Sequence, residues 1–482
     1  MEAVTESQSP PGLANRTARV IVSKGLPLTA GLALRLYALL KLFEVNGDSL
    51  IYGSIARNLL LHGRYAMGDP GPAISSTLIR LPGYPLFLAA CFRLFGMENY
   101  FAPCCIAVVL DLFTCLLLAG FVEHIVAPRE RSGAACATLW LAALCPFTAS
   151  YTALPLTETP TLFALALSMW AMARFRDNPS WKYALWFTFA VCAAALLRPD
   201  GALAAIAFAP TLVIGLPRGA ITPSRLRSMA AVCIALTLMP FAAWTWRNWH
   251  IFHVFQPLAP RLAVDPGEDP HRGWERWVKT WCLDYISTNQ IYWNVPDDVF
   301  DLNDLPARAF DSPAQYAQTA ALVRDYNNNG MDLTPDLDAR FARLAEERIA
   351  AHPLRYYVLL PLGRVADMWL RPRVENLPID LDWWVYKHHY AETRFSWAWT
   401  ALNALYLLLA VVGLCLRPRL WPALLAYMLL RSALLLSVSA PEARYTLECF
   451  PMLFALGGVA LHWVVNFVCL SVLKVNASFG SG

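Results

Sequence analysis

Residues 101–127, FAPCCIAVVLDLFTCLLLAGFVEHIVA, decide the class of this fold. One helix needs about 20 apolar residues to cross the hydrocarbon core of a bilayer, and this run exceeds that length. Asp111 and Glu123 are its only acidic or basic residues, histidine aside. The run therefore predicts a transmembrane helix, and the rest of the chain is interpreted outward from it.

Nine more apolar runs flank this stretch on both sides. We expect ten spans in all, at 26–43, 101–127, 133–151, 158–174, 182–197, 201–216, 228–246, 396–416, 419–438 and 446–472. Two further segments are doubtful: 83–96 is short for a bilayer, and 354–371 is amphipathic. We expect both to lie at the membrane interface as helices, although an arrangement with twelve spans stays open.

The composition supports an all-α polytopic membrane protein. The 482 residues are 57% hydrophobic and 15% charged, whereas soluble proteins average about 25% charged residues. A soluble enzyme, a disordered chain and a disulfide scaffold are thereby disfavoured. Most of the 12 cysteines lie in apolar runs and none forms a C-x-x-C pair, so no zinc knuckle is indicated. The net charge of +4 is not gathered into a basic face, which argues against nucleic-acid binding.

The distribution of basic residues predicts the orientation, because short cytoplasmic loops carry the excess of Lys and Arg. With ten spans and the N-terminus inside, one side of the membrane receives Arg16, Arg19, Lys24, Arg129, Arg131, Arg174, Arg176, Lys182, Arg218, Arg225, Arg227, Arg417, Arg419 and Lys474. The first 25 residues lack the apolar core of a signal peptide, so the first span is expected to be retained. An alanine-, arginine- and tryptophan-rich composition suits a bacterial inner membrane.

This topology divides the chain into five parts. We expect cytoplasmic tails at 1–25 and 473–482, a membrane module at 26–246 with a first outer loop at 44–82, and C-terminal helices at 354–472. The hydrophilic segment 247–353 faces outward and is too long for an idle connection. Its residues 336–351 have helical spacing of Leu337, Phe341, Leu344 and Ile349, which predicts a small helical extracytoplasmic domain.

Ionisable residues at the outer ends of spans are candidates for chemistry. Asp48 follows the first span, and partial desolvation would raise its pKa and suit it to act as a general base; a helix N-cap is the alternative. Arg80 precedes a Pro-Gly-Tyr-Pro turn and suits a lipid phosphate, unless it only snorkels to the headgroups. Glu158 begins an apolar helix, where a favourable helix dipole is the competing explanation. Asp111, inside a span, is interpreted as an interhelical hydrogen-bonding residue.

Six short motifs in order resemble the GT-C fold glycosyltransferases, in particular the branch of protein O-mannosyltransferases and aminoarabinose lipid A transferases. They are Asp48-x-x-x-Tyr52-x-x-x-Ala56 with Arg80-x-Pro82-x-Tyr84-Pro85, Leu156-Thr157-Glu158, Leu197-Arg198-Pro199, Trp246-Arg247-Asn248 and Glu442-Ala-Arg444-Tyr445. The resemblance covers about residues 30–465 apart from 255–350. The chain departs from the family at Ser49, where many members have Glu, and at Gly83, where a Pro-Pro pair would end.

The resemblance implies an inverting transfer of a sugar from a polyprenyl-phosphate donor to an acceptor hydroxyl on the extracytoplasmic face. Asp48 then matches the catalytic acid and Glu158 the second acid, while Arg80, Arg247 and Arg444 are expected to hold the donor phosphate. Tyr52, Tyr84, Arg198, Glu442 and Tyr445 are supporting residues. No metal or other cofactor is expected, although a divalent cation shared by Asp48 and Glu158 stays open. The expected partners are the lipid-linked donor, a protein, lipid or glycan acceptor, and membrane lipids.

Other interpretations compete with this one. A transporter or flippase for lipid-linked sugars would share the position in the membrane, but paired interrupted helices in two related halves are not evident. A non-catalytic accessory protein would be expected to lack Asp48. A ligase or polymerase of lipid-linked glycans would differ only in its acceptor.

Overall fold

A computed structural model describes residues 24–69, 74–217, 219–380, 382–384 and 387–479, the last ten as backbone only. The described chain is mostly helical, and its only strands are β1 (Ala66–Met67) and β2 (Ser75–Ser76), which pair antiparallel. The predicted all-α class is therefore confirmed. The tail 1–25, except its last two residues, lies outside the described residues, as do Arg16, Arg19, Arg218 and residues 480–482 of the second tail.

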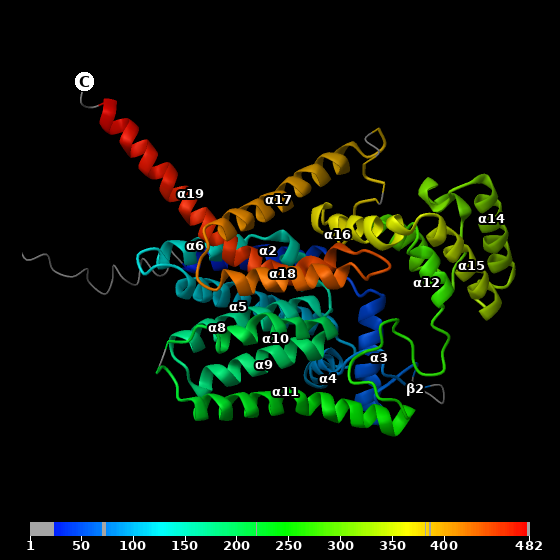
Figure 1. Cartoon of the computed structure of the whole chain (residues 1–482), viewed down its shortest axis with the longest axis horizontal. Coiled ribbons are helices and arrows are strands. Elements are labelled where there is room, and N and C mark those ends of the chain that lie inside the picture. The colour runs from blue at the N-terminus through cyan, green and yellow to red at the C-terminus, as the bar shows by residue number, and fades with distance from the viewer. Residues whose placement is uncertain (1–23, 70–73, 218, 381, 385–386, 480–482) are drawn as a thin grey trace, which may run out of the picture.

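The membrane part is a layer of helices that run side by side (Figure 1). Its helices are α2 (Leu26–Lys41), α5 (Phe101–Ile125), α6 (Arg131–Ala143), α7 (Pro146–Ser150), α8 (Glu158–Asp177), α9 (Trp181–Leu197), α10 (Leu203–Phe208), α11 (Pro223–Phe252), α17 (Tyr390–Cys415), α18 (Trp421–Leu435) and α19 (Phe450–Phe479). Helix α8 packs between α5 and α9, and α19 packs against α17 and α6. The main hydrophobic core lies among these helices and includes Phe121, Leu165, Phe187, Tyr427 and Phe450.

Most predicted spans coincide with one helix, and two do not. The expected span 133–151 is bent by 47° between α6 and the stretch Pro146–Ala153, because Pro146 lacks the amide hydrogen that would continue the ladder. The expected span 201–216 contains only the short helix α10 between the 3-10 turns η3 (Pro199–Ala202) and η4 (Ala209–Leu212). A proline lies at the start of each turn.

By length and composition, four described stretches can cross a bilayer: α5, α11, α17 and Ala443–Cys469. The bent pair beginning at Arg131 brings the number to five, and Trp181–Leu197 and Trp421–Leu435 are shorter apolar helices. These helices and the fold make the chain an integral membrane protein. The predicted number of ten spans stays a prediction.

A buried ion pair joins the first two long helices of the layer. Arg35 of α2 donates from Nε to Oδ2 of Asp111 in α5 at 2.7 Å, and its other nitrogens donate to the carbonyls of Ala142 and Ala143. Both charged side chains are almost fully buried. The interpretation of Asp111 as an interhelical hydrogen-bonding residue is confirmed.

The segments predicted to face outward gather at one end of this layer (Figure 1). Helices α3 (Gly47–His62) and α4 (Gly83–Phe95) come from the first outer loop, and α12 (Arg272–Val278), α13 (Tyr285–Ser287), α14 (Pro313–Asn328) and α15 (Pro335–Ala351) follow α11. Helices α12, α14 and α15 enclose a separate core around Trp277, Trp281 and Tyr326. Leu337, Phe341, Leu344 and Ile349 are all buried on α15, as their spacing predicted.

The two doubtful segments form short helices. Helix α4 has 13 residues, or about 20 Å of length at 1.5 Å per residue, which is short of a bilayer core. The second segment forms η8 (Arg355–Leu359) and α16 (Leu360–Leu370). Its Arg364 is buried and donates to the carbonyls of Lys279 and Cys282, so this helix is tied to the outer segment.

Candidate functional site

The site is built around Asp48, in the first turn of α3. Its Oδ1 lies 2.9 Å from Nη2 of Arg80, which comes from the turn before α4, and its Oδ2 lies 2.9 Å from Nη2 of Arg444, which precedes α19. Segments almost 400 residues apart in sequence thus meet at one carboxylate. Such charge-assisted contacts are among the strongest polar interactions that proteins form.

The competing explanations for Asp48 and Arg80 do not hold. Helix α3 is capped by Asn46, whose side chain accepts from the backbone N–H of Ser49, so Asp48 is not the N-cap. The guanidinium of Arg80 turns toward Asp48 and lies 5.6 Å above the ring of Tyr52, rather than extending to the headgroups. Both side chains therefore point into a shared site.

The charge state of Asp48 differs from the sequence-based expectation. Burial raises its pKa, as expected, but the neighbouring guanidinium groups of Arg444 and Arg80 outweigh burial and hold the pKa below its usual value. The expectation of a raised pKa was wrong because it placed no cation beside the carboxylate. Asp48 is therefore ionised at neutral pH and can accept a proton. Its two ion pairs stabilise the carboxylate, however, and so make it a weak base.

A chain of alternating charges continues inward from Arg444. Glu158, at the start of α8, lies 3.8 Å from Arg444 and 3.1 Å from Arg198. Arg198 in turn lies 2.7 Å from Glu448, which contacts Arg431 at 3.2 Å. Asp200 closes the inner end by pairing with both Arg198 and Arg431. Because Glu158, Arg431 and Glu448 are almost fully buried, removing one member would leave an uncompensated charge.

Four other predicted residues line the site, two of them beside Arg444 and two on the side of Arg80. Glu442 contacts Nε of Arg444 at 2.5 Å and accepts a hydrogen bond from the hydroxyl of Tyr445. The ring of Tyr445 lies beneath the guanidinium groups of Arg198 and Arg444. Tyr52 and Tyr84 pack edge to face at 5.0 Å on the side of Arg80.

Arg247 is the one predicted site residue that lies apart. Its guanidinium donates to the carbonyls of Thr77 and Tyr65 at 2.7 Å each and stacks near Trp244 and Phe252. It makes no described contact with Asp48, Glu158 or Arg444. These contacts hold the loop between α3 and α4 against α11.

Two cavities meet at this cluster. One, of about 620 Å³, contains Asp48 and Arg444 and has a polar wall that includes Asn46, Asn289 and Asn376. The other, of about 510 Å³, contains Arg198, Arg431 and Tyr445 and has an apolar wall that includes Leu203, Leu258, Leu262, Leu434, Leu435 and Val438. Glu442 and Trp293 line both cavities and so form the partition between them.

Sequence reasoning missed Glu375, which lines the same cavity as Asp48. It lies in the loop between α16 and α17 with a side chain that is 9% exposed, and Nε of Arg371 is 3.3 Å from its Oε1. Burial raises its pKa, and Arg371 offsets this only in part. Glu375 and Asn376 lie between two hydrophobic segments of the sequence. The only sequence feature that could have indicated Glu375 as a site residue is its position as an acid between two candidate spans.

The residues near Asp48 do not favour a metal shared with Glu158. The guanidinium of Arg444 lies between the two carboxylates and contacts both of them, where a bridging cation would have to bind. Among the described residues, the one group of His, Cys, Asp and Glu close enough to share an ion lies elsewhere. The expectation that the reaction needs no metal stays a prediction.

Comparison with known proteins agrees with the resemblance found in the motifs. Residues 80–244, less than half of the chain, match the family model described as dolichyl-phosphate-mannose-protein mannosyltransferase. The stretch begins at Arg80 and ends at Trp244, so it includes Glu158 and Arg198. No sequence among the curated proteins matches the chain.

The fold is similar to that of solved GT-C enzymes. An archaeal oligosaccharyltransferase, AglB from Archaeoglobus fulgidus, in complex with an inhibitory peptide and a dolichol-phosphate, is 11% identical with a TM-score of 0.50 over 96% of this chain and 52% of that chain. The oligosaccharyltransferase of the same organism, tethered to an acceptor peptide, is 12% identical to this chain with a TM-score of 0.51. The match covers 95% of this chain and 51% of that chain. ArnT from Cupriavidus metallidurans bound to undecaprenyl phosphate is 14% identical, with a TM-score of 0.40 and coverage of 92% and 77%. This chain thus spans about half the length of the two oligosaccharyltransferase chains.

Proposed function

This chain is a membrane protein with the GT-C glycosyltransferase fold, and we propose that it is an inverting glycosyltransferase. It moves a sugar from a polyprenyl-phosphate donor to an acceptor hydroxyl at the extracytoplasmic end of the membrane. The observation that carries the proposal is Asp48, held between Arg80 and Arg444 at a 620 Å³ cavity. A carboxylate and two guanidinium groups are the base and the phosphate ligands that this reaction requires.

The reaction balances with these groups alone. The acceptor hydroxyl gives its proton to Asp48 as its oxygen attacks the anomeric carbon. The bond between that carbon and the phosphate oxygen breaks on the opposite face, and its electron pair leaves with the polyprenyl phosphate. Arg80 and Arg444 stabilise the charge that develops on the leaving phosphate.

Donor binding activates the base in this mechanism. Burial acts to raise the pKa of Asp48, while Arg444 and Arg80 hold it below its usual value. A donor phosphate competes for both guanidinium groups, so the effect of burial then prevails and the pKa of Asp48 rises. Asp48 becomes a stronger base only when a donor is present, which disfavours proton transfer from an acceptor that arrives alone.

The two cavities suit the two substrates. The 510 Å³ cavity offers leucine side chains to isoprene units, and its lining includes Arg198, which pairs with Glu158 as the phosphate ligand Arg444 does. The 620 Å³ cavity offers amide and carboxylate side chains, including Glu375, to a hydroxylated acceptor. The acceptor and the lipid would then meet at Glu442 and Trp293, which line both cavities.

The test measures release of polyprenyl phosphate by the purified protein in nanodiscs, with a panel of short-chain polyprenyl-phosphate sugars and mixed hydroxyl acceptors. We expect Asp48→Asn to reduce release at least 100-fold, in a protein that is still folded and unfolds cooperatively on heating. Asp69→Asn, in the same outer loop but fully exposed, is the matched control and should keep wild-type activity.

Two results would contradict the proposal. Undiminished release by Asp48→Asn would exclude Asp48 as the base and direct attention to Glu375. No release by the wild type from any donor, together with transfer of a fluorescent donor between the leaflets of a vesicle, would favour the transporter.

A further inference from the structure

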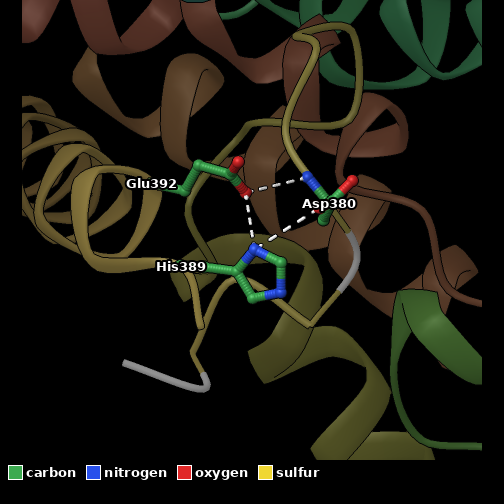
Figure 2. A group of neighbouring side chains, drawn as sticks. All are labelled: Asp380, His389 and Glu392. Atoms are coloured by element: carbon green, nitrogen blue, oxygen red, sulfur yellow. Dashed lines mark hydrogen bonds and ion pairs between the residues drawn. The ribbon is translucent and has the colours of Figure 1, made fainter. Parts of the chain in front are cut away.

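A second group of ionisable side chains lies in the segment before α17, away from the cluster around Asp48. Asp380 and His389 belong to the loop that leads into this helix, and Glu392 belongs to its first turn. Figure 2 shows the imidazole of His389 pointing between the carboxylates of Asp380 and Glu392. One potential ligand atom from each residue lies within 4.8 Å of the others.

The distances within this group fit a coordination shell better than hydrogen bonds. Nδ1 of His389 lies 3.4 Å from Oδ2 of Asp380 and 3.6 Å from Oε2 of Glu392. Hydrogen bonds between nitrogen and oxygen are typically about 2.7–3.2 Å long. Two ligand atoms at ~2.0–2.1 Å from a tetrahedral Zn²⁺ lie about 3.4 Å apart. The two separations from Nδ1 are thus close to those of neighbouring ligands around one ion, and all three ligand atoms lie within 4.8 Å of one another.

The far side of the imidazole has the partner that metal-bound histidines require. Nε2 of His389 lies 3.1 Å from Oδ1 of Asp382. A carboxylate on the second nitrogen sets the tautomer so that Nδ1 carries a lone pair toward the ion. Oε2 of Glu392 also accepts from the backbone N–H of Asp380 at 3.0 Å, which holds that ligand oxygen in place.

The charge balance points to a cation. Three carboxylates, those of Asp380, Asp382 and Glu392, surround one imidazole. Within the described parts of the chain, no Lys or Arg lies at ion-pair distance from any of the three. Even a protonated His389 would leave two negative charges uncompensated, whereas a divalent ion with neutral imidazole leaves one.

We propose that Asp380, His389 and Glu392 form a divalent-cation site, best suited to Zn²⁺, that fixes the loop before α17. Nitrogen and carboxylate oxygen ligands suit zinc, and three protein ligands leave a fourth position for water. The loop also carries Arg373, which donates to the carbonyl of Ala443 at 2.7 Å, and Glu375 in the cavity with Asp48. An ion at this site would steady one wall of that cavity without taking part in the chemistry.

The test measures zinc binding itself, so it does not depend on any glycosyltransferase activity. The full chain is purified without a histidine tag, its cysteines are alkylated, and metal is removed with a chelator. Zn²⁺ is then titrated in competition with a chromophoric indicator. We expect one equivalent to bind the wild type, at least 100-fold weaker binding by His389→Ala, and 10- to 100-fold weaker binding by Asp382→Asn.

His388→Ala is the matched control, because His388 is the exposed neighbouring residue and contributes no ligand. It should bind zinc as the wild type does. Zinc should also slow proteolysis between residues 371 and 389 in the wild type and in His388→Ala, but not in His389→Ala. Equal zinc affinity in wild type and His389→Ala, or no stoichiometric binding by the wild type, would overturn the proposal.

Discussion

At the scale of single residues, Asp48 is governed by its two arginines. Each guanidinium stabilises the ionised carboxylate, and together they offset the effect of burial on its pKa. A base in this state gains strength when one arginine is removed or occupied. The pH dependence of the reaction therefore reports directly on these contacts.

We predict that Arg80→Gln moves the acid limb of the pH profile of kcat/KM for the donor to higher pH. Losing this guanidinium raises the pKa of Asp48, so the carboxylate is protonated and inactive as a base at a higher pH than in the wild type. The rate should also fall at all pH values, since a phosphate ligand is lost. Arg57→Gln, whose arginine pairs with Glu98 on the other face of α3, should leave the limb in place.

We predict that the Glu375 carboxylate lowers the stability of the folded protein at neutral pH but contributes to acceptor binding. Its pKa is raised by burial, so its stabilising contribution is present at acidic pH and is lost as the pH rises through its folded-state pKa. Glu375→Gln should therefore unfold at a higher temperature than the wild type at pH 8, with a smaller difference at pH 5. Its kcat/KM for the acceptor should drop at least tenfold, a loss usual for a misplaced substrate contact.

The control for this prediction is Glu347→Gln, an exposed acid on α15. It should change neither the melting temperature nor the acceptor kinetics. A Glu375→Gln protein with wild-type acceptor kinetics would show that the carboxylate does not contact the acceptor.

At the scale of elements, the packing of α4 on α9 depends on a close approach between their backbones. Gly83 opens α4 directly after the turn that carries Arg80, and a Cβ there would lie 2.6 Å from the carbonyl oxygen of Leu196 in α9. The glycine here allows α4 to pack directly on the backbone of α9. The position of Arg80 thus depends on this contact.

We predict that Gly83→Ala destabilises the protein by about 1–3 kcal/mol, the usual cost of overpacking, and weakens donor use by displacing Arg80. Gly47→Ala tests the same change at the start of α3, where a Cβ meets nothing within 4 Å. Thermal unfolding in detergent should show a loss only for Gly83→Ala. An unchanged melting temperature for that variant would contradict the close packing of α4 on α9.

At the scale of the whole molecule, helices α3, α4, α12, α14 and α15 lie at one end of the helical layer (Figure 1). The basic loops between spans lie toward the other end. The excess of Lys and Arg in these loops predicts that this other end faces the cytoplasm. Arg129, between α5 and α6, and Asn329, after α14, are both exposed and mark the two ends.

We predict that a membrane-impermeant maleimide labels Asn329→Cys in intact cells and labels Arg129→Cys only after permeabilisation. The reason is the excess of Lys and Arg in the loops beside Arg129, which favours a cytoplasmic location. The unsubstituted chain gives the background from its native cysteines. The reverse pattern of labelling would place the site on the cytoplasmic side.

The sequence by itself determined where most of the helices lie and which ionisable residues stand at their ends. Apolar runs by themselves located α2, α5, α8, α9, α11, α17, α18 and α19, because a bilayer requires each crossing helix to be apolar over its whole length. The spacing of Leu337, Phe341, Leu344 and Ile349 likewise determined the buried face of α15. Asp48, Arg80, Glu158 and Arg444 were found as ionisable residues at span ends, where such residues are costly unless they are used.

Only the tertiary structure decided how these residues are paired. The contacts of Asp48 with Arg444, of Arg198 with Glu448 and of Arg431 with Asp200 join segments hundreds of residues apart. Local patterns carry no information about such pairing, so the lowered pKa of Asp48, the place of Glu375 in the cavity and the separate position of Arg247 were not predictable. Long-range packing sets the electric field at each carboxylate, and that field determines what the carboxylate can do.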